Sequence, residues 1–167
     1  MQGQVRFAGA LLHTGIIYSM DAAELKIQLA RRARACCESQ LLDLSGMDAG
    51  EVAIYSLSDP RDISAVRYIG QTRSPRRRLL QHIHTARLWL PEQRPWWVKS
   101  PQLRPLYEWI RELYRDEQRL PVMAVIAWTE ARHARSEERN RICAYLGQQV
   151  PLLNRETETI GRQILLL

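Results

Sequence analysis

The segment 74–82 (SPRRRLLQH) places three consecutive arginines where a helix is predicted to begin, since serine is a good N-cap and proline a good first helical residue. Positive charge in a first turn opposes the helix dipole, whereas a helix N-terminus attracts anions through its free backbone N–H groups. Arg76, Arg77 and Arg78 therefore indicate a phosphate site, and a solvated basic face is the equally weighted alternative from this segment alone. Arg78 and His82 are four residues apart and share one helical face.

A carboxylate on a later segment is a second candidate for chemistry. Residues 134–148 predict an amphipathic helix, on which Glu138 lies one turn before Ile142 and on the side that faces the core. Glu137 aligns instead with Arg141 on the outer side. A carboxylate aimed at the interior is costly unless it is paired or bound to a metal ion. Glu138 is therefore either a metal ligand or one half of a salt bridge to an arginine.

Two tyrosines lie near the middle of short β-rich runs. The runs are 52–56 and 65–70, and they carry Tyr55 and Tyr68. The polar stretch 58–62 (SDPRD) between them has turn chemistry, so we expect an antiparallel hairpin with a rather long loop. Tyrosine is a favoured strand residue, and simple packing is the alternative reading of both.

Taken together and in order, these residues resemble the GIY-YIG nuclease superfamily over about residues 51–155. The first glycine of the family pattern is replaced by Ala53, and the hairpin is slightly longer than usual. The ordered set is more specific than any one of its short motifs. The residues that carry the resemblance are Ala53-Ile54-Tyr55, Tyr68-Ile69-Gly70, Arg78, Glu138 and Asn154.

The resemblance implies hydrolysis of phosphodiester bonds with a single divalent cation, Mg²⁺ or Mn²⁺. It assigns Glu138 to the metal, Arg78 to the scissile phosphate, and Tyr55 and Tyr68 to the surroundings of the nucleophile. One hard cation on one carboxylate keeps several waters and can neutralise phosphate charge, which agrees with these roles.

The same resemblance covers the remaining site residues. His82 falls where the family places a tyrosine or histidine, and Asn154 resembles the asparagine that ties the last segment to the site. Tyr55, Tyr68 and His82 all remain candidates for the general base, with Tyr68 or His82 ranked first, because a phenol needs a nearby cation to titrate near neutrality. We expect four arginines to contact nucleic acid, namely Arg73, Arg76, Arg77 and Arg78.

Other segments supply the elements that position these residues. The helix that begins at Pro75 is predicted to continue to about Trp89, and the prolines of 91–105 exclude a long helix there. A helix over 106–117 follows, and the continuous apolar run 122–128 predicts a buried central strand. We therefore expect an α/β fold, with a small three-stranded antiparallel sheet flanked by helices.

The first part of the chain reads as a helical appendage. A helix is predicted from Asp21 to about Leu42, with Glu24 completing a capping box. We divide the chain into an N-terminal helical extension, 1–49, and a nuclease-like domain, 50–167. The extension is interpreted as a DNA arm, a dimerisation helix or part of the core.

Composition limits the class of protein. Hydrophobic residues make up 46% and charged residues 25% of the 167 residues, which excludes a long disordered chain. No apolar run reaches the roughly 18 residues that span a bilayer, so we expect no membrane partner. We expect no secretory signal. Three cysteines, without metal-ligand spacing, exclude a disulfide scaffold or zinc finger and favour a reducing, cytoplasmic setting: Cys36, Cys37 and Cys143.

Charge favours a polyanionic partner. The net charge is +6, and residues 1–49 contribute nothing to it because their five basic and five acidic side chains cancel. The leading hypothesis is a metal-dependent DNA endonuclease, serving restriction, phage defence or structure-specific cleavage. We expect double-stranded DNA as substrate, with single-stranded DNA left open, and a homodimer. The alternatives are a nucleic-acid-binding module that has lost catalysis, or an interaction protein whose surface includes Trp89, Trp96, Trp97 and Trp109.

Overall fold

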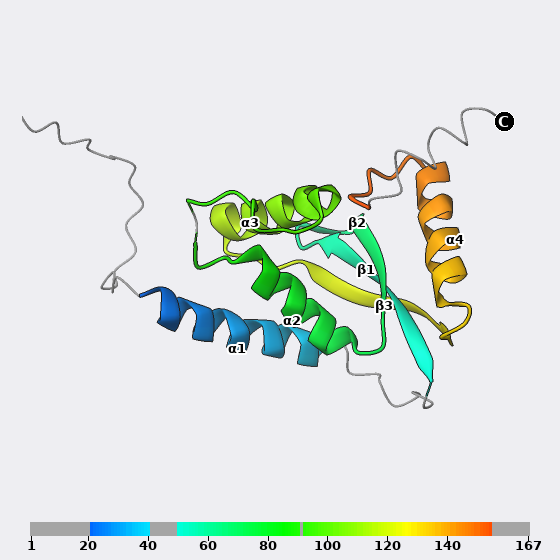
Figure 1. Cartoon of the computed structure of the whole chain (residues 1–167), viewed down its shortest axis with the longest axis horizontal. Helices are drawn as coiled ribbons and strands as arrows, with labels where there is room; N and C mark the ends of the chain where they lie inside the picture. Colours follow the sequence, from blue (N-terminus) through cyan, green and yellow to red (C-terminus); the bar gives the residue numbers. More distant parts are fainter. Residues whose placement is uncertain (1–20, 41–49, 91, 155–167) are drawn as a thin grey trace, which may run out of the picture.

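The structure is a computed structural model that describes residues 21–40, 50–90 and 92–154. In these residues the fold is α/β, with four helices and a three-stranded antiparallel sheet, as expected (Figure 1). A short 3₁₀ turn, Pro101–Leu103, precedes α3. In chain order the elements are α1 (Ala22–Gln40), β1 (Glu51–Asp59), β2 (Asp62–Thr72), α2 (Pro75–Ala86), α3 (Arg104–Glu117), β3 (Val122–Glu130) and α4 (Ala134–Gly147).

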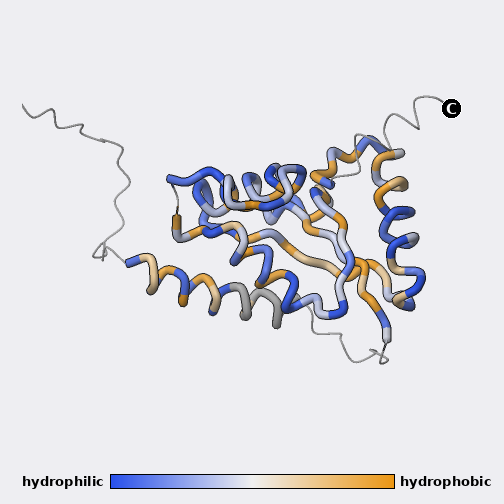
Figure 2. Tube along the Cα trace, in the orientation of Figure 1, coloured by the Kyte–Doolittle hydropathy of each residue, from blue (hydrophilic) through white to orange (hydrophobic). Residues whose placement is uncertain are grey.

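The strand order is β2-β1-β3, so β1 is central. The prediction that 122–128 forms the central strand was wrong: β3 pairs with β1 alone, at an edge of the sheet. Its residues are nevertheless apolar because both of its faces are partly covered, by α1 on one side and α4 on the other. Figure 2 shows this hydrophobic colouring along β3 and the hydrophilic start of α2. A continuous apolar run indicates that other elements pack on both faces of a strand, and this can be true of an edge strand as well as of a central one.

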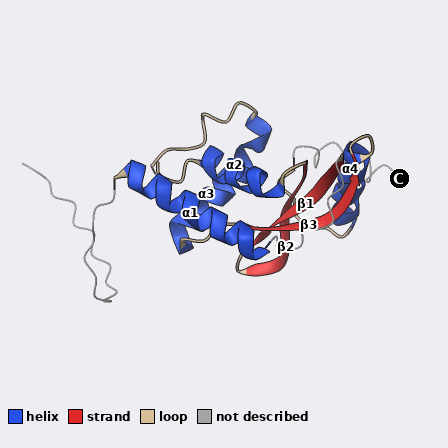
Figure 3. Ribbon diagram, turned by 90° about the horizontal axis from the view of Figure 1, so that it is seen from below, coloured by secondary structure: helices blue, strands red, loops and turns tan. Residues whose placement is uncertain are grey.

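Helices cover both faces of the sheet. Figure 3 shows α1, α2 and α3 grouped on one face and α4 on the other. Because side chains alternate along a strand, β1 sends Tyr55 and Leu57 into the larger core beneath the three helices. Ile54 points to the smaller core under α4, where Ile69 and Ile142 meet it. The sheet therefore separates two hydrophobic clusters.

The helix α1 begins where the capping signal predicted. The backbone N–H of Glu24 donates to Asp21 Oδ1 at 2.7 Å. The helix packs on α2 and β3, and its Leu29, 2% exposed, belongs to the larger core. Part of the segment 1–49 thus packs with the elements that follow residue 50.

The β1–β2 hairpin is tighter than expected. Only Pro60 and Arg61 separate the strands, because both strands extend beyond the runs that predicted them. Arg61 Nε donates to Asp59 Oδ1 at 2.8 Å, and Asp59 pairs with Asp62 across the turn. Arg67 is skipped between two register pairs, so a bulge absorbs part of the extra length that the sequence assigned to a loop.

The helix α2 ends three residues earlier than expected. Arg87 adopts a left-handed conformation, with φ 47°, and its N–H donates to His84 O. The described part of the proline-rich stretch then forms turns and the short 3₁₀ segment, in agreement with the prediction of no long helix. Within the described residues, no helix is both long and apolar enough to cross a membrane.

Candidate active site

The hairpin brings Tyr55 and Tyr68 together on one face of the sheet. Tyr55 pairs with Gly70 and Leu57 pairs with Tyr68, so the two tyrosines are diagonal neighbours, with ring centroids 6.2 Å apart. Gly70 is needed for this arrangement: a Cβ there would lie 2.5 Å from Tyr55 Oη and 2.6 Å from its Cζ. The Tyr55 ring thus crosses the neighbouring strand at the position that has no side chain.

The helix α2 supplies Arg78 and His82 to the same place. His82 Nε2 lies 2.8 Å from Tyr55 Oη in a buried hydrogen bond, and Arg78 Nε donates to the same oxygen at 3.2 Å. Ser74 occupies the N-cap position that sets the start of α2, although its side chain makes no capping hydrogen bond. The four-residue spacing between Arg78 and His82 therefore delivers a cation and an imidazole to one phenol oxygen.

Glu138 approaches from α4, on the opposite side of the sheet. It is half-buried, and Gln71 Nε2 donates to its Oε2 at 2.9 Å. Glu137 instead pairs with Arg141 on the outer side at 2.8 Å, as the helical spacing predicted. Gln71 directly follows Gly70 on β2, so this contact places the carboxylate at the same end of the hairpin as Tyr55 and Arg78.

Electrostatics shows that Arg78 and Glu138 both act on Tyr68. Burial is the main cause that raises the pKa of Tyr68; the charge of Arg78 opposes this rise and the charge of Glu138 adds to it. Burial likewise raises the pKa of Tyr55 well above its ordinary value. Arg78 therefore acts on both phenols, and the charge of Glu138 acts on Tyr68.

His82 is held neutral. Burial, with a smaller contribution from the Arg78 charge, lowers its pKa to about 3. A neutral imidazole offers one donor and one acceptor, and its second nitrogen, Nδ1, lies 3.4 Å from Tyr107 Oη. The ring is thus set between the phenols of Tyr55 and Tyr107 and is 1% exposed.

Tyr107 is the site residue that the sequence analysis missed. It lies on α3, its ring centroid is 6.0 Å from that of His82, and burial raises its pKa. Its spacing to Ile110 and Tyr114 follows a helical stripe, and all three are buried. That stripe predicts a core position but gives no indication of the imidazole that Tyr107 meets.

Asn154 ties the segment after α4 to β2. Its Oδ1 accepts from Ile69 N at 2.9 Å and its Nδ2 donates to Ile69 O at 2.7 Å. Leu153 N adds a bond to Arg67 O at 2.6 Å. These bonds satisfy the outer edge of β2 beside Tyr68 and hold that strand in place.

The four arginines of the sequence prediction separate in the structure. Arg78 is half-buried and points toward Tyr55, Tyr68, His82 and Tyr107, which we call the tyrosine cluster. Arg73, Arg76 and Arg77 are exposed around the start of α2. Of these four arginines, Arg78 is the one that contacts a tyrosine of the hairpin.

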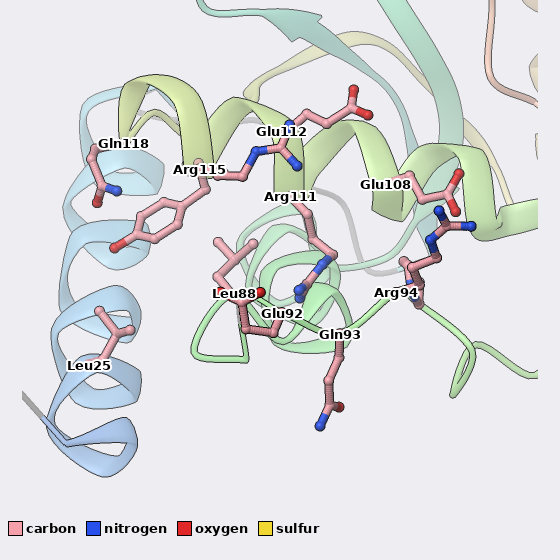
Figure 4. Close-up of a pocket in the computed structure, with 12 residues that line it drawn as sticks. Leu25, Leu88, Glu92, Gln93, Arg94, Glu108, Arg111, Glu112, Arg115 and Gln118 are labelled. Carbon is pink, nitrogen blue, oxygen red and sulfur yellow. The ribbon is translucent and has the colours of Figure 1, made fainter. Parts of the chain in front are cut away.

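A separate groove of about 830 Å³ lies between α1, the end of α2 and α3 (Figure 4). Its lining mixes charges of both signs, including Glu108, Arg111 and Arg115. Arg111 Nη1 there donates to the carbonyl oxygens of Ala86 and Arg87 at 2.8 Å each, which completes the end of α2. None of the residues that line this groove belongs to the tyrosine cluster, which is a distinct site.

A single cation would fit the donor set at Glu138. Within the described residues no three His, Cys, Asp or Glu side chains converge. A hard cation held by the Glu138 carboxylate would complete its coordination with water and phosphate oxygens, which is the way Mg²⁺ usually binds at phosphoryl sites. The Gln71 amide orients the carboxylate by occupying Oε2.

Acid is expected to destabilise the protein through His82. Below about pH 6.5 the unfolded chain binds a proton at this residue, while the folded chain does so only near pH 3, so the free energy of unfolding falls as pH is lowered across that range. The slope is at most about 1.4 kcal/mol per pH unit. Urea unfolding between about pH 7 and pH 4.5 measures it.

The matched control for this slope is His84→Gln, because His84 is exposed on the same helix. His82→Gln should lose the slope, and His84→Gln should keep it. An unchanged slope in His82→Gln would show that other groups cause the acid sensitivity.

Comparison of the chain with family models, with curated proteins and with solved structures finds no match. The geometry of the cluster is therefore the basis for any functional reading. Residues from β1, β2, α2 and α3 supply it, and Glu138 of α4 contacts Gln71 of β2 on the opposite side of the sheet.

Proposed function

We propose that the chain is a metal-dependent DNA endonuclease of the GIY-YIG type, which hydrolyses phosphodiester bonds with one Mg²⁺ or Mn²⁺. The observation that supports this best is that Arg78 donates a hydrogen bond to Tyr55 while the charge of Glu138, from a different helix, acts on Tyr68. Phosphodiester hydrolysis needs an activated water, positive charge on the phosphate and help for the leaving oxygen. A cation at Glu138 would supply Lewis acidity and neutralise charge on the phosphate.

Arg78 is the group that binds the scissile phosphate in this proposal. Its Nε is engaged by Tyr55 and its Nη1 donates to Gln81 Oε1 at 2.8 Å, so the guanidinium plane is held in one orientation. A fixed, half-buried guanidinium can direct its remaining N–H groups at two oxygens of a phosphate. The bidentate contact stabilises the charge that builds up as water attacks.

Tyr68 is the general base that we favour. Burial raises its pKa, the charge of Arg78 opposes that rise, and a bound cation would lower the pKa further. The Tyr55 hydroxyl is instead already engaged by both His82 and Arg78. His82 is a poor base near neutrality, since its pKa is about 3 and its ring is enclosed. We assign His82 and Tyr107 to holding Tyr55 in place.

Incubation with supercoiled plasmid tests the proposal directly. Nicked and linear products are expected with Mg²⁺ or Mn²⁺ and none with a chelator, because the leaving oxygen needs the cation. A single-stranded circle in parallel determines strand preference. Failure to cut either DNA would contradict the proposal, as would cutting that survives the chelator; salt-dependent binding without cutting would instead favour a module that has lost catalysis.

A further inference from the structure

Trp96 is a large aromatic side chain in solvent, 68% exposed. It lies in a tight turn in which Trp96 N donates to Arg94 O at 2.7 Å and Val98 N donates to Pro95 O at 3.2 Å. Pro95 and Val98 are buried, so they anchor the turn on both sides of Trp96. The turn is therefore fixed to the protein while its tip presents an indole.

The ring of Trp97 packs against the Trp96 indole and is itself held in place by several contacts. Its Nε1 donates to Thr85 O at 2.7 Å, and the guanidinium carbons of Arg87 and Arg111 lie 5.0 and 5.3 Å from its ring centroid. The Trp96 and Trp97 rings meet edge to face, with centroids 6.1 Å apart. Trp96 thus rests on a ring that is hydrogen-bonded to α2 and restrained by two cations.

Charge around this platform identifies the kind of partner. The segment 87–104 carries four positive side chains and one negative, Glu92, and the adjoining groove, which Arg94 and Pro95 help to line, adds two basic and two acidic side chains from α3. The other large exposed hydrophobics among the described residues are Ile27 and Ile63, which lie on α1 and β2, so Trp96 is the one large exposed hydrophobic side chain in the described part of 87–104, where positive side chains outnumber negative ones. The positive residues are Arg87, Arg94, Lys99 and Arg104.

We infer that Trp96 stacks on an unpaired base of a nucleic acid strand. Cationic grooves that follow the phosphates, combined with aromatic rings that stack on bases, are how proteins hold single strands without reading sequence. A protein partner would instead require a larger contiguous interface with an apolar centre. An indole held firmly at the tip of a turn loses little side-chain freedom on stacking.

The hydrogen bond from Trp97 to Thr85 of α2 relates the Trp96–Trp97 pair to the proposed active site, and this step rests on the proposed function. Thr85 follows Arg78 by seven residues, which corresponds to about 10 Å along a helix at 1.5 Å per residue. The residue that anchors Trp97 therefore lies about two helical turns from Arg78 on the same helix.

Fluorescence anisotropy with a labelled oligothymidine and a labelled blunt duplex, both in chelator, tests the contact. Trp96→Ala is expected to weaken binding of the single strand about 10-fold or more and to change duplex binding less than about 2-fold, because stacking needs an accessible base face. Trp96→Phe should retain most of the affinity. Ile63→Ala removes an equally exposed side chain on β2 and should change neither.

Equal binding of the single strand by Trp96→Ala and the intact protein would overturn the inference. So would equal losses for single strand and duplex, or a change from dimer to monomer in sedimentation with DNA binding retained, which would identify a surface between copies of this chain. These binding measurements are made in chelator and do not depend on whether the protein cuts DNA. A protein that binds through Trp96 and never cuts would contradict only the proposed nuclease.

Discussion

Glu138→Gln is expected to lower the rate of Mg²⁺-dependent DNA cleavage by about 10³-fold, because it removes the charge that would hold the cation. Glutamine preserves the size of the side chain and can still accept a hydrogen bond from Gln71, which lies 2.9 Å from Glu138 Oε2. The fold and DNA binding should therefore change little. Single-turnover cleavage of plasmid, with anisotropy for binding and thermal unfolding for stability, measures the three effects separately.

The adjacent residue provides the control. Glu137→Gln removes the same charge from the same turn of α4, but Glu137 pairs with Arg141 on the outer side. Its cleavage rate should stay within about 3-fold, since a partly exposed ion pair of this kind contributes little. Equal rates for Glu138→Gln and the intact protein would remove Glu138 from the site, and equal losses in both variants would point to a general effect of charge on α4.

Arg78→Lys should lower cleavage by about 10²- to 10³-fold, which is the size of loss that follows removal of one well-placed donor to a developing negative charge. Lysine retains the positive charge but has no planar fork, so it cannot bind two phosphate oxygens while it donates to Tyr55 Oη, as Arg78 Nε does at 3.2 Å. Rates at saturating DNA separate a loss in the chemical step from a loss in binding.

Arg77→Lys is the matched comparison, because Arg77 is exposed one position earlier on α2. This variant should cut within about 3-fold of the intact protein and show a similar dependence on salt. If Arg78→Lys cuts as fast as Arg77→Lys, the phosphate is bound elsewhere and the assignment of Arg78 fails.

Local rules in the sequence were sufficient to place the hairpin tyrosines and the start of α2. Ser74 followed by Pro75 predicts a helix start whatever the rest of the chain does, and Arg78 and His82 then share a face by periodicity alone. The outer position of Glu137 follows from the same spacing on α4. These predictions succeed because they depend on neighbours within one or two turns.

Features that depend on contacts between distant segments could not be obtained in this way. Tyr107 reads as one more core residue of α3, and only tertiary packing brings it to His82. The apolar run of β3 follows from the helices that pack against both of its faces. Its place at the edge of the sheet follows from the pairing of β1 with both β2 and β3. The contact of Gln71 with Glu138 likewise joins β2 to a helix 67 residues later.

The residues at positions 55 and 70 are expected to evolve together. Because a Cβ at position 70 would lie 2.5 Å from the Tyr55 hydroxyl oxygen, a residue larger than glycine fits at position 70 only if Tyr55 moves or is replaced by a smaller residue. Divergence among descendants of this chain should therefore keep the pair intact or alter both members together, with a bulkier residue at 70 matched by a shorter one at 55. The absence of a side chain at position 70 is therefore as necessary for this packing as the phenol of Tyr55 that fills the space.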